Sequence, residues 1–224
     1  MKKIAVIKND FKRKFGIPRQ SGIADKFVSE IVFEPEYRVK EALRGIEGYS
    51  HLWLIWEFSE AKREGWSATV RPPRLGGNKR MGVFATRSPF RPNPIGLSSV
   101  KLLEVCKTSD RGLVLKVSGA DLMDGTPILD IKPYLSFTDS HPDAVCGFAE
   151  DVFDYSLKVD FPEKFINIIP EEKREGLIAL LESDPRPSYI KDGERIYTFS
   201  FAEFEISFKV SDKVLTVTEI EKRK

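Results

Sequence analysis

The run HLWLIWEF, residues 51–58, restricts the fold more than any other segment of the sequence. Its large apolar side chains fall on both faces of an extended chain, whereas a strand with one face in water alternates between apolar and polar residues. We therefore expect a central, buried strand here. Further short runs with the character of strands are separated by loops rich in Pro and Gly, and they lie at residues 3–8, 27–33, 81–86, 96–107 and 112–118.

The first half of the chain contains one expected helix, over residues 35–47. Four of its apolar residues recur at three- and four-residue spacing, as one face of a helix requires. They are Val39, Ala42, Leu43 and Ile46. Many short strands with a single early helix favour a β-barrel or a curled sheet. Strands do not alternate regularly with helices, and no G-x-G-x-x-G follows a strand, so the sequence does not support a Rossmann-type site.

The composition changes after about residue 150. A helix is expected at residues 170–183, ended by Pro185 because a proline disfavours helical backbone in the residue before it. Three alternating runs then predict a meander of strands, at residues 195–201, 204–210 and 214–220. We therefore predict a mainly β chain, with a β-barrel-type domain at residues 1–150, a small α+β domain at residues 151–224, and a boundary within residues 151–162.

The chain carries 36 Lys and Arg against 34 Asp and Glu, so its net charge of +2 says little about its partners. The distribution of charge is more informative. No acidic residue lies between Glu64 and Glu104, whereas seven basic residues do. They are Arg71, Arg74, Lys79, Arg80, Arg87, Arg91 and Lys101. A basic segment in a nearly neutral chain is typical of a surface that faces phosphates, although a solvated basic loop has the same composition.

Cysteine and histidine are too sparse for a metal centre. Cys106 and Cys146 are the only cysteines, His51 and His141 the only histidines, and they do not have the spacing of metal ligands. We expect ordinary reduced thiols and no metal site. No apolar run is long enough to span a membrane, and the N-terminus MKKIAVIKND lacks the apolar core of a signal peptide. We therefore expect a cytoplasmic protein.

The segment at residues 70–98 combines five prolines, four glycines and six basic residues, between two expected strands. Prolines fix φ and lower the entropy lost when a loop becomes ordered, and glycines allow the backbone to approach a ligand closely. Arginines on such a loop suit the recognition of planar or anionic groups by a bidentate guanidinium. A rigid loop with a purely structural role remains the alternative.

The segment DLMDGTPILDIKPYL, residues 121–135, places Asp121, Asp124 and Asp130 among apolar residues. A carboxylate in such surroundings needs a partner. Asp124 precedes a glycine and could belong to a tight turn, but three carboxylates could also hold a ligand's ribose hydroxyls or ammonium, or accept a hydrogen bond from an adenine amine. His51 is weaker evidence for a site, because a lone histidine at the start of a buried strand is more often structural.

Several motifs of the chain resemble, in their order, those of the TrmO-type tRNA methyltransferases, also called YaeB. These motifs are GIPRQSG, GYSHLWLIWEF, RPPRLGGN, GVFATRSPFRPNPIG, DGTPILDIKPYL and SDPRPSY. The resemblance covers nearly the whole chain. It implies a β-barrel methyltransferase that works as a homodimer and uses S-adenosylmethionine. It also implies tRNA as partner and N-threonylcarbamoyladenosine beside the anticodon as substrate, methylated on the nitrogen that carries the threonylcarbamoyl group.

The family's cofactor contacts can be carried over residue by residue. They fall on Pro18, Arg19, Gln20, His51, Leu52, Arg87, Leu97, Asp121, Leu122, Met123 and Asp124. Met123 stands where we expect a smaller aliphatic residue, which should affect only packing. Because a sulfonium methyl group is already activated, the enzyme chiefly has to place the attacking nitrogen in line with it. A nearby acceptor for the proton of that nitrogen would help, but the sequence does not indicate which residue this is.

Candidates for contacts to tRNA lie on the proline-stiffened loop. They are Arg71, Arg74, Lys79, Arg80 and Arg91. The threonylcarbamoyl group ends in a carboxylate, for which a bidentate arginine is the best partner, and we favour Arg91 because Pro89 and Pro92 flank it. The C-terminal domain is expected either to help in docking tRNA or forming the dimer, or to cap the barrel. The alternatives in function are a tRNA-binding module that keeps the cofactor pocket without transfer, and a related methyltransferase with another substrate.

Overall fold

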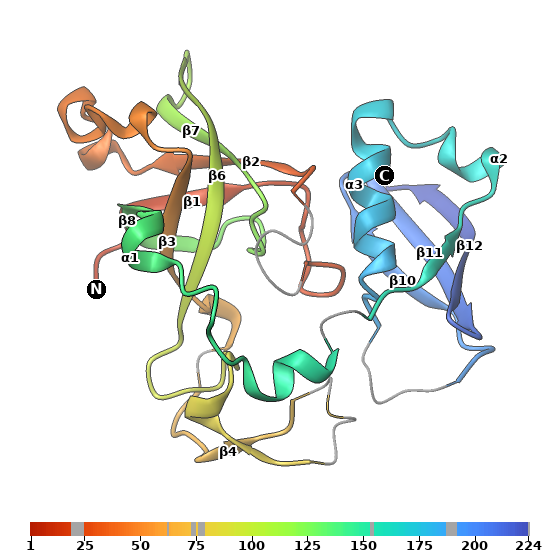
Figure 1. The fold of residues 1–224 in the computed structure, drawn as a ribbon. Coiled ribbons are helices and arrows are strands. Elements are labelled where there is room, and N and C mark those ends of the chain that lie inside the picture. Colours follow the sequence, from red (N-terminus) through yellow and green to blue (C-terminus); the bar gives the residue numbers. More distant parts are fainter. Residues whose placement is uncertain are drawn as a thin grey trace.

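The computed structural model describes residues 1–18, 25–61, 63–72, 75, 79–152, 155–186 and 192–223. Six antiparallel strands of the N-terminal part pair in the order β1-β2-β7-β6-β3-β8 and close into a barrel, because β8 pairs again with β1 (Figure 1). They are β1 (Ala5–Lys8), β2 (Val28–Phe33), β3 (His51–Glu57), β6 (Ile95–Thr108), β7 (Gly112–Ser118) and β8 (Pro127–Pro133). The expected mainly β, non-Rossmann fold is confirmed.

Strand β3 pairs with β6 on one side and β8 on the other, but only one of its faces is fully buried, so the expected burial of both faces is confirmed only in part. Leu52, Leu54 and Trp56 alternate into the barrel core and are almost completely buried. The opposite face of the strand is only half-buried. There the indole N–H of Trp53 donates to Asp139 on the short helix α1 (Ser136–Asp139), so apolar residues on both faces of β3 have a structural reason.

The helix expected at residues 35–47 is wrong. The segment instead forms three short 3₁₀ turns, η1 (Pro35–Tyr37), η2 (Lys40–Leu43) and η3 (Ile46–Gly48). Val39 is extended, at φ −105° and ψ 121°, and Gly45 adopts a left-handed φ of 89°, so a continuous helix is interrupted twice. The apolar face that suggested a helix still has a function, because Leu43 and Ile46 pack against the barrel core.

The strand expected at residues 81–86 is only partly present. Two residues form β5 (Met81–Gly82), which pairs with β4 (Thr69–Val70), and the chain then enters the 3₁₀ turn η6 (Val83–Ala85). The N–H and the hydroxyl of Thr86 both donate to the carbonyl of Val83 and close this turn. The segment between β3 and β6, which also contains η4 (Ser59–Ala61), projects as a lobe at one end of the barrel (Figure 1).

The C-terminal part is a four-stranded sheet covered by a helix. Its strand order is β10-β11-β12-β9, and β9 is parallel to β12. The elements after the barrel are η7 (Gly147–Val152), β9 (Lys158–Asp160), α2 (Glu163–Ile166), α3 (Glu171–Glu182), β10 (Tyr197–Phe201), β11 (Phe204–Ser211) and β12 (Val214–Lys222). The expected helix and meander are thus confirmed, while the three-residue strand β9 was not predicted.

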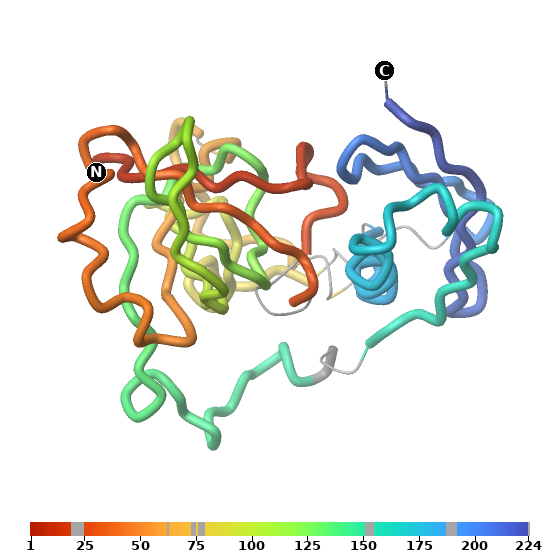
Figure 2. Tube along the Cα trace, turned by 90° about the horizontal axis from the view of Figure 1, so that it is seen from above, coloured from red at the N-terminus to blue at the C-terminus, as the bar shows by residue number. Residues whose placement is uncertain are grey.

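The core of this C-terminal part includes residues from the beginning of the chain. Phe11 and Phe27 are buried in it, and their rings meet edge to face with centroids 5.1 Å apart. Asp10 forms an ion pair with Lys173 on α3, and its carbonyl accepts a hydrogen bond from Ala202. The segment after β1 therefore leaves the barrel and packs against the C-terminal sheet and helix, as its path in Figure 2 shows.

Cys106 and Cys146 are both free thiols. In the part of the chain that the structure describes, no helix is both long and apolar enough to cross a membrane, and no cluster of His, Cys, Asp or Glu could hold a metal ion.

Candidate cofactor and RNA site

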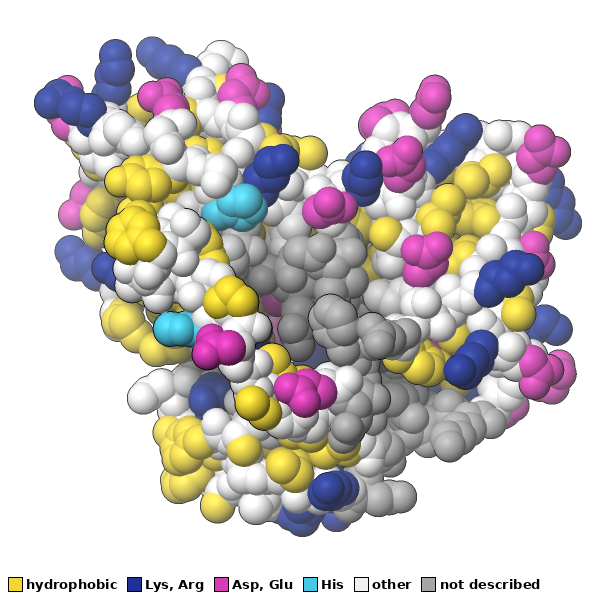
Figure 3. All heavy atoms as spheres, viewed as in Figure 1, with side chains coloured by type: hydrophobic (Ala, Val, Ile, Leu, Met, Phe, Trp, Pro, Cys, Tyr) yellow, Lys and Arg dark blue, Asp and Glu magenta, His cyan; other side chains and the backbone are white. Residues whose placement is uncertain are grey.

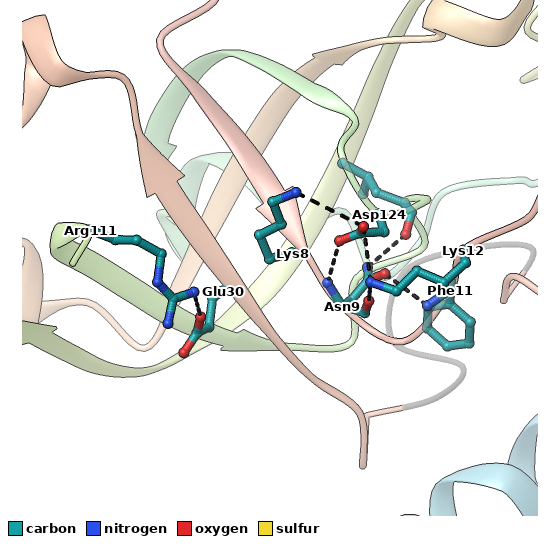
Figure 4. Close-up of polar contacts among 8 residues, drawn as sticks. Lys8, Asn9, Phe11, Lys12, Glu30, Arg111 and Asp124 are labelled. Atoms are coloured by element: carbon teal, nitrogen blue, oxygen red, sulfur yellow. Dashed lines mark hydrogen bonds and ion pairs between the residues drawn. The ribbon is translucent and has the colours of Figure 1, made fainter. Parts of the chain in front are cut away.

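The loop between β7 and β8, which carries Asp121 to Asp124, is tied to the segment that leaves β1. The carboxylate of Asp124 accepts a hydrogen bond from the backbone N–H of Asn9 (3.0 Å) and pairs with Lys12 (2.9 Å) and Lys8 (4.0 Å) (Figure 4). The Asn9 side chain in turn donates to the carbonyl of Leu122 at 2.8 Å. The structure therefore gives Asp124 the partners that its apolar surroundings require, and these contacts fix the shape of the loop.

Asp121 is held from the barrel side. Its carboxylate accepts a hydrogen bond from the hydroxyl of Ser98 (2.5 Å). The hydroxyl oxygen of Ser98 in turn accepts a hydrogen bond from the indole N–H of Trp56 (2.9 Å). Ser98 and Trp56 are buried, whereas Asp121 is half-buried. The backbone of Gly96 lies directly against the indole, because a Cβ at this position would be 2.2 Å from the ring. A buried chain of donors therefore orients Asp121 at the edge of the barrel.

His51 lies on the outer wall of the barrel, where Ser50 forms a hydrogen bond with its Nδ1 (2.9 Å). It borders an open hollow of about 630 Å³. The other residues that line this hollow are Asp25, Lys26, Val28, Ser99, Lys101, Leu103, Ser118 and Gly119. Leu97 points outward from β6 on the same face as Ser99, and 56% of its surface is exposed. The structure thus brings His51, Leu97 and the start of the Asp121 loop to one side of the barrel.

Two of the expected contact residues have side chains that cannot reach a ligand. Leu52 and Leu122 are 0% and 1% exposed and belong to the barrel core. Only their backbone could contribute to a site. Pro18 is also buried, Met123 is half-buried and Arg87 is exposed. Arg19, Gln20 and Arg74 lie outside the described residues.

The basic candidates on the projecting lobe differ in what they contact. Arg80 donates from Nε to the hydroxyl of Thr69 (2.7 Å), and Arg91 donates from Nη1 to the carbonyl of Thr86 (3.0 Å). Both arginines therefore brace the lobe. The other described candidates, Arg71 and Lys79, are exposed.

Asn9 and Lys12 anchor the site loop, although neither was among the site residues expected from the sequence. Asn9 also caps its own turn, because its side-chain oxygen accepts the N–H of Phe11 at 3.0 Å. Asparagine just after a strand is a turn signal, and this signal was present in the sequence. It did not indicate that the turn would be bonded to a loop more than a hundred residues away.

Fold and site together define a closed antiparallel barrel with a small α+β C-terminal part and a polar loop fixed at the barrel edge. The family described as the tRNA-methyltransferase O N-terminal domain matches residues 6–140, and the TrmO C-terminal domain matches residues 154–223. The chain belongs to this tRNA-methyltransferase O family.

Similar proteins cover almost all of the chain. The tRNA (adenine(37)-N6)-methyltransferase of Escherichia coli K12 is 42% identical over 228 residues, which covers 98% of this chain and 97% of that protein. The enzyme of the same name from Eikenella corrodens is 44% identical over 163 residues, or 72% of this chain and 91% of that protein. The crystal structure of TrmO from Pseudomonas aeruginosa matches with a TM-score of 0.75 and 31% identity, covering 98% and 97% of the two chains.

Proposed function

We propose that this protein transfers a methyl group from S-adenosylmethionine to the exocyclic N6 of adenine 37 in tRNA. The observation that carries the proposal is the 42% identity, over nearly the full length of both chains, with the E. coli enzyme named for this reaction. Because the proposed substrate is tRNA, we also propose that the protein works in the cytoplasm.

Asp121 and Leu97 on the barrel and Arg87 on the lobe fit the chemistry of the cofactor. S-adenosylmethionine presents an ammonium, a carboxylate, a sulfonium, two ribose hydroxyls and an adenine. The half-buried carboxylate of Asp121 suits the ammonium or the hydroxyls, the exposed Arg87 suits the carboxylate, and the outward side chain of Leu97 suits the adenine face. We assign the cofactor contacts to these three residues and His51, and to the backbone of Leu52, Leu122 and Met123. Pro18, Arg19, Gln20 and Asp124 remain candidates by resemblance.

When bound, the cofactor supplies an activated methyl group. The contribution of the protein is therefore position rather than covalent catalysis. The hydrogen bond from Ser98 fixes the direction of Asp121, and the bonds from Asn9 and Lys12 to Asp124 hold the loop that follows it. Such double anchoring keeps the loop from reorganising when substrate arrives, which is the condition for in-line attack by a weakly nucleophilic amine.

We further propose that the substrate adenosine carries a threonylcarbamoyl group and that an arginine of the lobe binds its carboxylate. Arg91 remains the preferred candidate. Its hydrogen bond to the carbonyl of Thr86 restricts the guanidinium before substrate binds, which lowers the entropy lost on binding. Arg71 and Arg80 are the exposed alternatives, and Arg80, like Arg91, is held by a hydrogen bond to a neighbouring residue.

A homodimer is the proposed assembly. Besides Leu97, which is assigned to the cofactor, the outer wall of the barrel exposes the apolar side chains of Val28 and Leu103, which are 53% and 46% exposed. Apolar side chains gathered on one wall are typical of a protein interface. Sedimentation of the purified protein tests this assembly, and a monomer at all accessible concentrations would exclude it.

Transfer is tested with methyl-labelled S-adenosylmethionine and tRNA that contains or lacks the threonylcarbamoyl group, followed by mass spectrometry of nucleosides. We expect one added methyl group on the modified adenosine at position 37 and little on unmodified tRNA. Methylation of both tRNAs would support the methyltransferase activity but contradict the proposed specificity for threonylcarbamoylated adenosine. Binding of cofactor and tRNA without any transfer would instead favour a non-catalytic tRNA-binding module.

A further inference from the structure

Two large aromatic side chains are exposed side by side on the projecting lobe. Trp66 is 58% exposed and Phe84 is 72% exposed, and their ring centroids lie 6.0 Å apart with planes inclined by 32°. The pairing of β4 with β5 brings them together, because Trp66 precedes β4 and Phe84 follows β5. Aromatic rings contribute most of their stabilisation when buried, so their exposure here needs a reason other than folding.

The backbone under both rings is fixed. Val83, the neighbour of Phe84, is buried, and its N–H donates to the carbonyl of Ala68 at 2.9 Å. On the Trp66 side, the guanidinium of Arg80 donates to the hydroxyl of Thr69 at 2.7 Å. These contacts tie down the strand that follows Trp66 and the turn that carries Phe84, which lowers the entropy lost when the rings bind a partner.

Basic residues outnumber the acidic Glu60 and Glu64 on the lobe that carries the rings. No acidic residue occurs between Glu64 and Glu104, and Arg71, Lys79 and Arg87 are exposed in this stretch. The space-filling view shows hydrophobic and basic side chains together on the lobe that carries β4 (Figure 3). Exposed aromatic rings among cations are typical of surfaces that bind unpaired nucleotides, since every base offers a face for stacking and every phosphate a negative charge.

A second copy of the chain fits the patch of Trp66 and Phe84 less well than unpaired RNA does. Stacking this patch on its symmetry mate would bring exposed Arg71, Lys79 and Arg87 of both copies into one interface, and like charges facing each other cost several kcal/mol. Paired RNA is also a poorer occupant, because bases inside a helix have no free face, whereas bases in loops can stack on aromatic side chains.

We infer that Trp66 and Phe84 form a stacking platform for unpaired RNA bases, and that under the proposed function these are bases of the anticodon loop. The choice of loop rests on the proposed function, but stacking on unpaired RNA can be measured without transfer. The platform would bind bases beside the modified adenosine, while the cofactor site acts on the adenosine itself.

The test measures the affinity of the full-length protein for two fluorescent RNAs with the same number of phosphates, a hairpin with an anticodon-sized loop and a fully paired duplex. We expect Trp66→Ala and Phe84→Ala each to weaken binding of the hairpin about tenfold or more, with less than about a twofold effect on the duplex. Trp66→Phe and Phe84→Tyr retain a ring and should stay within about threefold of the wild type. Phe137→Ala, at an 86% exposed phenyl ring on α1, is the matched control and should bind both RNAs normally.

The salt dependence adds a second readout. Because neither alanine variant removes a charge, both should keep the wild-type slope of log affinity against log salt. Equal loss of affinity for hairpin and duplex, unchanged hairpin binding in both variants, or failure of the wild type to bind the hairpin would each overturn the platform. Unchanged hairpin binding together with dissociation of a dimer in Phe84→Ala would assign the patch to self-association.

The platform and the proposed function can fail separately. Loss of hairpin binding in the two alanine variants, with no methyl transfer by the wild type, would retain the platform and reject the methyltransferase. Normal transfer and normal hairpin affinity in both variants would retain the methyltransferase and reject the platform. Both variants should bind S-adenosylmethionine with wild-type affinity in calorimetry, which shows that the fold and the cofactor site are intact.

Discussion

The ring of Phe27, just before β2, lies 5.3 Å from the ring of Phe201 at the end of β10. The backbone of α3 touches the same phenyl group, since a Cβ at Gly176 would lie 2.5 Å from its Cε1. Phe11 completes the cluster. Phe11 and Phe27, on the two sides of the connection from β1 to β2, are therefore structural parts of the C-terminal core, and an alteration at either end of the chain affects the other.

Replacing Phe27 by Ala should lower the free energy of unfolding by about 3–5 kcal/mol, the usual cost of removing a buried phenyl ring. Gly176→Ala should cost about 1–3 kcal/mol through overpacking against Phe27. Urea unfolding measures both. Phe137→Ala, at an 86% exposed ring, should change stability by less than about 0.5 kcal/mol, and an equal loss in all three variants would contradict the packing argument.

Ser98 and Ser29 make a matched pair of buried serines, 1% and 2% exposed. Ser98→Ala leaves the indole N–H of Trp56 without its acceptor and should cost about 1–3 kcal/mol. It should also weaken S-adenosylmethionine binding, because Asp121 loses one of the contacts that orient it, the hydrogen bond from Ser98. Among the described residues Ser29 Oγ has no hydrogen-bond partner, so Ser29→Ala should be neutral or stabilising and should leave cofactor affinity unchanged. Equal effects of the two substitutions on stability and calorimetric affinity would refute the role of the Ser98 bonds.

Asp184 provides a pH-dependent contribution to stability. Burial opposes ionisation of this carboxyl, but hydrogen bonds from Arg186 and Tyr155 outweigh it and hold its pKa below the usual value. A carboxyl whose pKa is lower in the folded state stabilises the protein above its unfolded pKa of about 3.9, and this contribution is lost as the pH falls through the folded value.

The substitution Asp184→Asn tests this linkage, because Asn tolerates the positive φ of 52° at this position. The wild type should be more stable than the variant at pH 7, and the difference in free energy of unfolding should shrink once the pH falls below about 4. A difference that stays constant from neutral to acid pH would show that the charge of Asp184 is not the cause.

Lys79 is the best position for testing contact between the lobe and the phosphates of tRNA, because its side chain is exposed. A substitution of Arg80 would also remove its hydrogen bond to Thr69. Lys79→Glu should weaken binding of any tRNA and flatten the slope of log affinity against log salt. Cofactor affinity should not change. Lys222→Glu, at an exposed lysine of β12, is the control, and an equal loss there would point to overall charge rather than to the lobe.

Arg91→Lys should lower the rate of transfer to threonylcarbamoylated tRNA by about tenfold or more, because lysine cannot form the planar fork that matches a carboxylate. Affinity for S-adenosylmethionine should remain as in the wild type. Arg71→Lys, measured alongside with modified and unmodified tRNA, assigns the role to one arginine. If both variants retain wild-type rates on modified tRNA, the carboxylate is bound elsewhere.

Elements with a strong local pattern could be predicted from the sequence. β3, β7 and α3 begin and end within a residue of the expected ranges, because their apolar spacing matches one type of element. The helix expected at residues 35–47 failed because a left-handed glycine and an extended valine interrupt a run whose spacing alone fits a helix. The spacing of apolar residues does not predict the backbone conformation of individual residues within the run.

Contacts between distant segments could not be predicted. The sequence indicated that Asp124 needs a partner, but Lys12 and Asn9 lie far away in the chain, and only the closure of the barrel brings them near. The same holds for Phe27 and Phe201, whose apolar character was visible and whose pairing was not. The assignments of Arg19, Gln20 and Arg74 stay predictions.

The burial of Phe11 and Phe27 in the C-terminal core has a consequence for biosynthesis. A ribosome makes these two rings among the first residues of the chain, yet the side chains that bury them, Phe201 among them, are made almost last. Until then α3 can cover one side of Phe27, but the faces that Phe201 covers stay exposed on a nascent chain whose barrel strands are already complete, and exposed apolar groups of this kind are what chaperones bind. A chain that ended before Tyr197 would keep α3 but lack the sheet that covers Phe11 and Phe27, so it would expose apolar surface and be prone to aggregation rather than form a smaller stable protein.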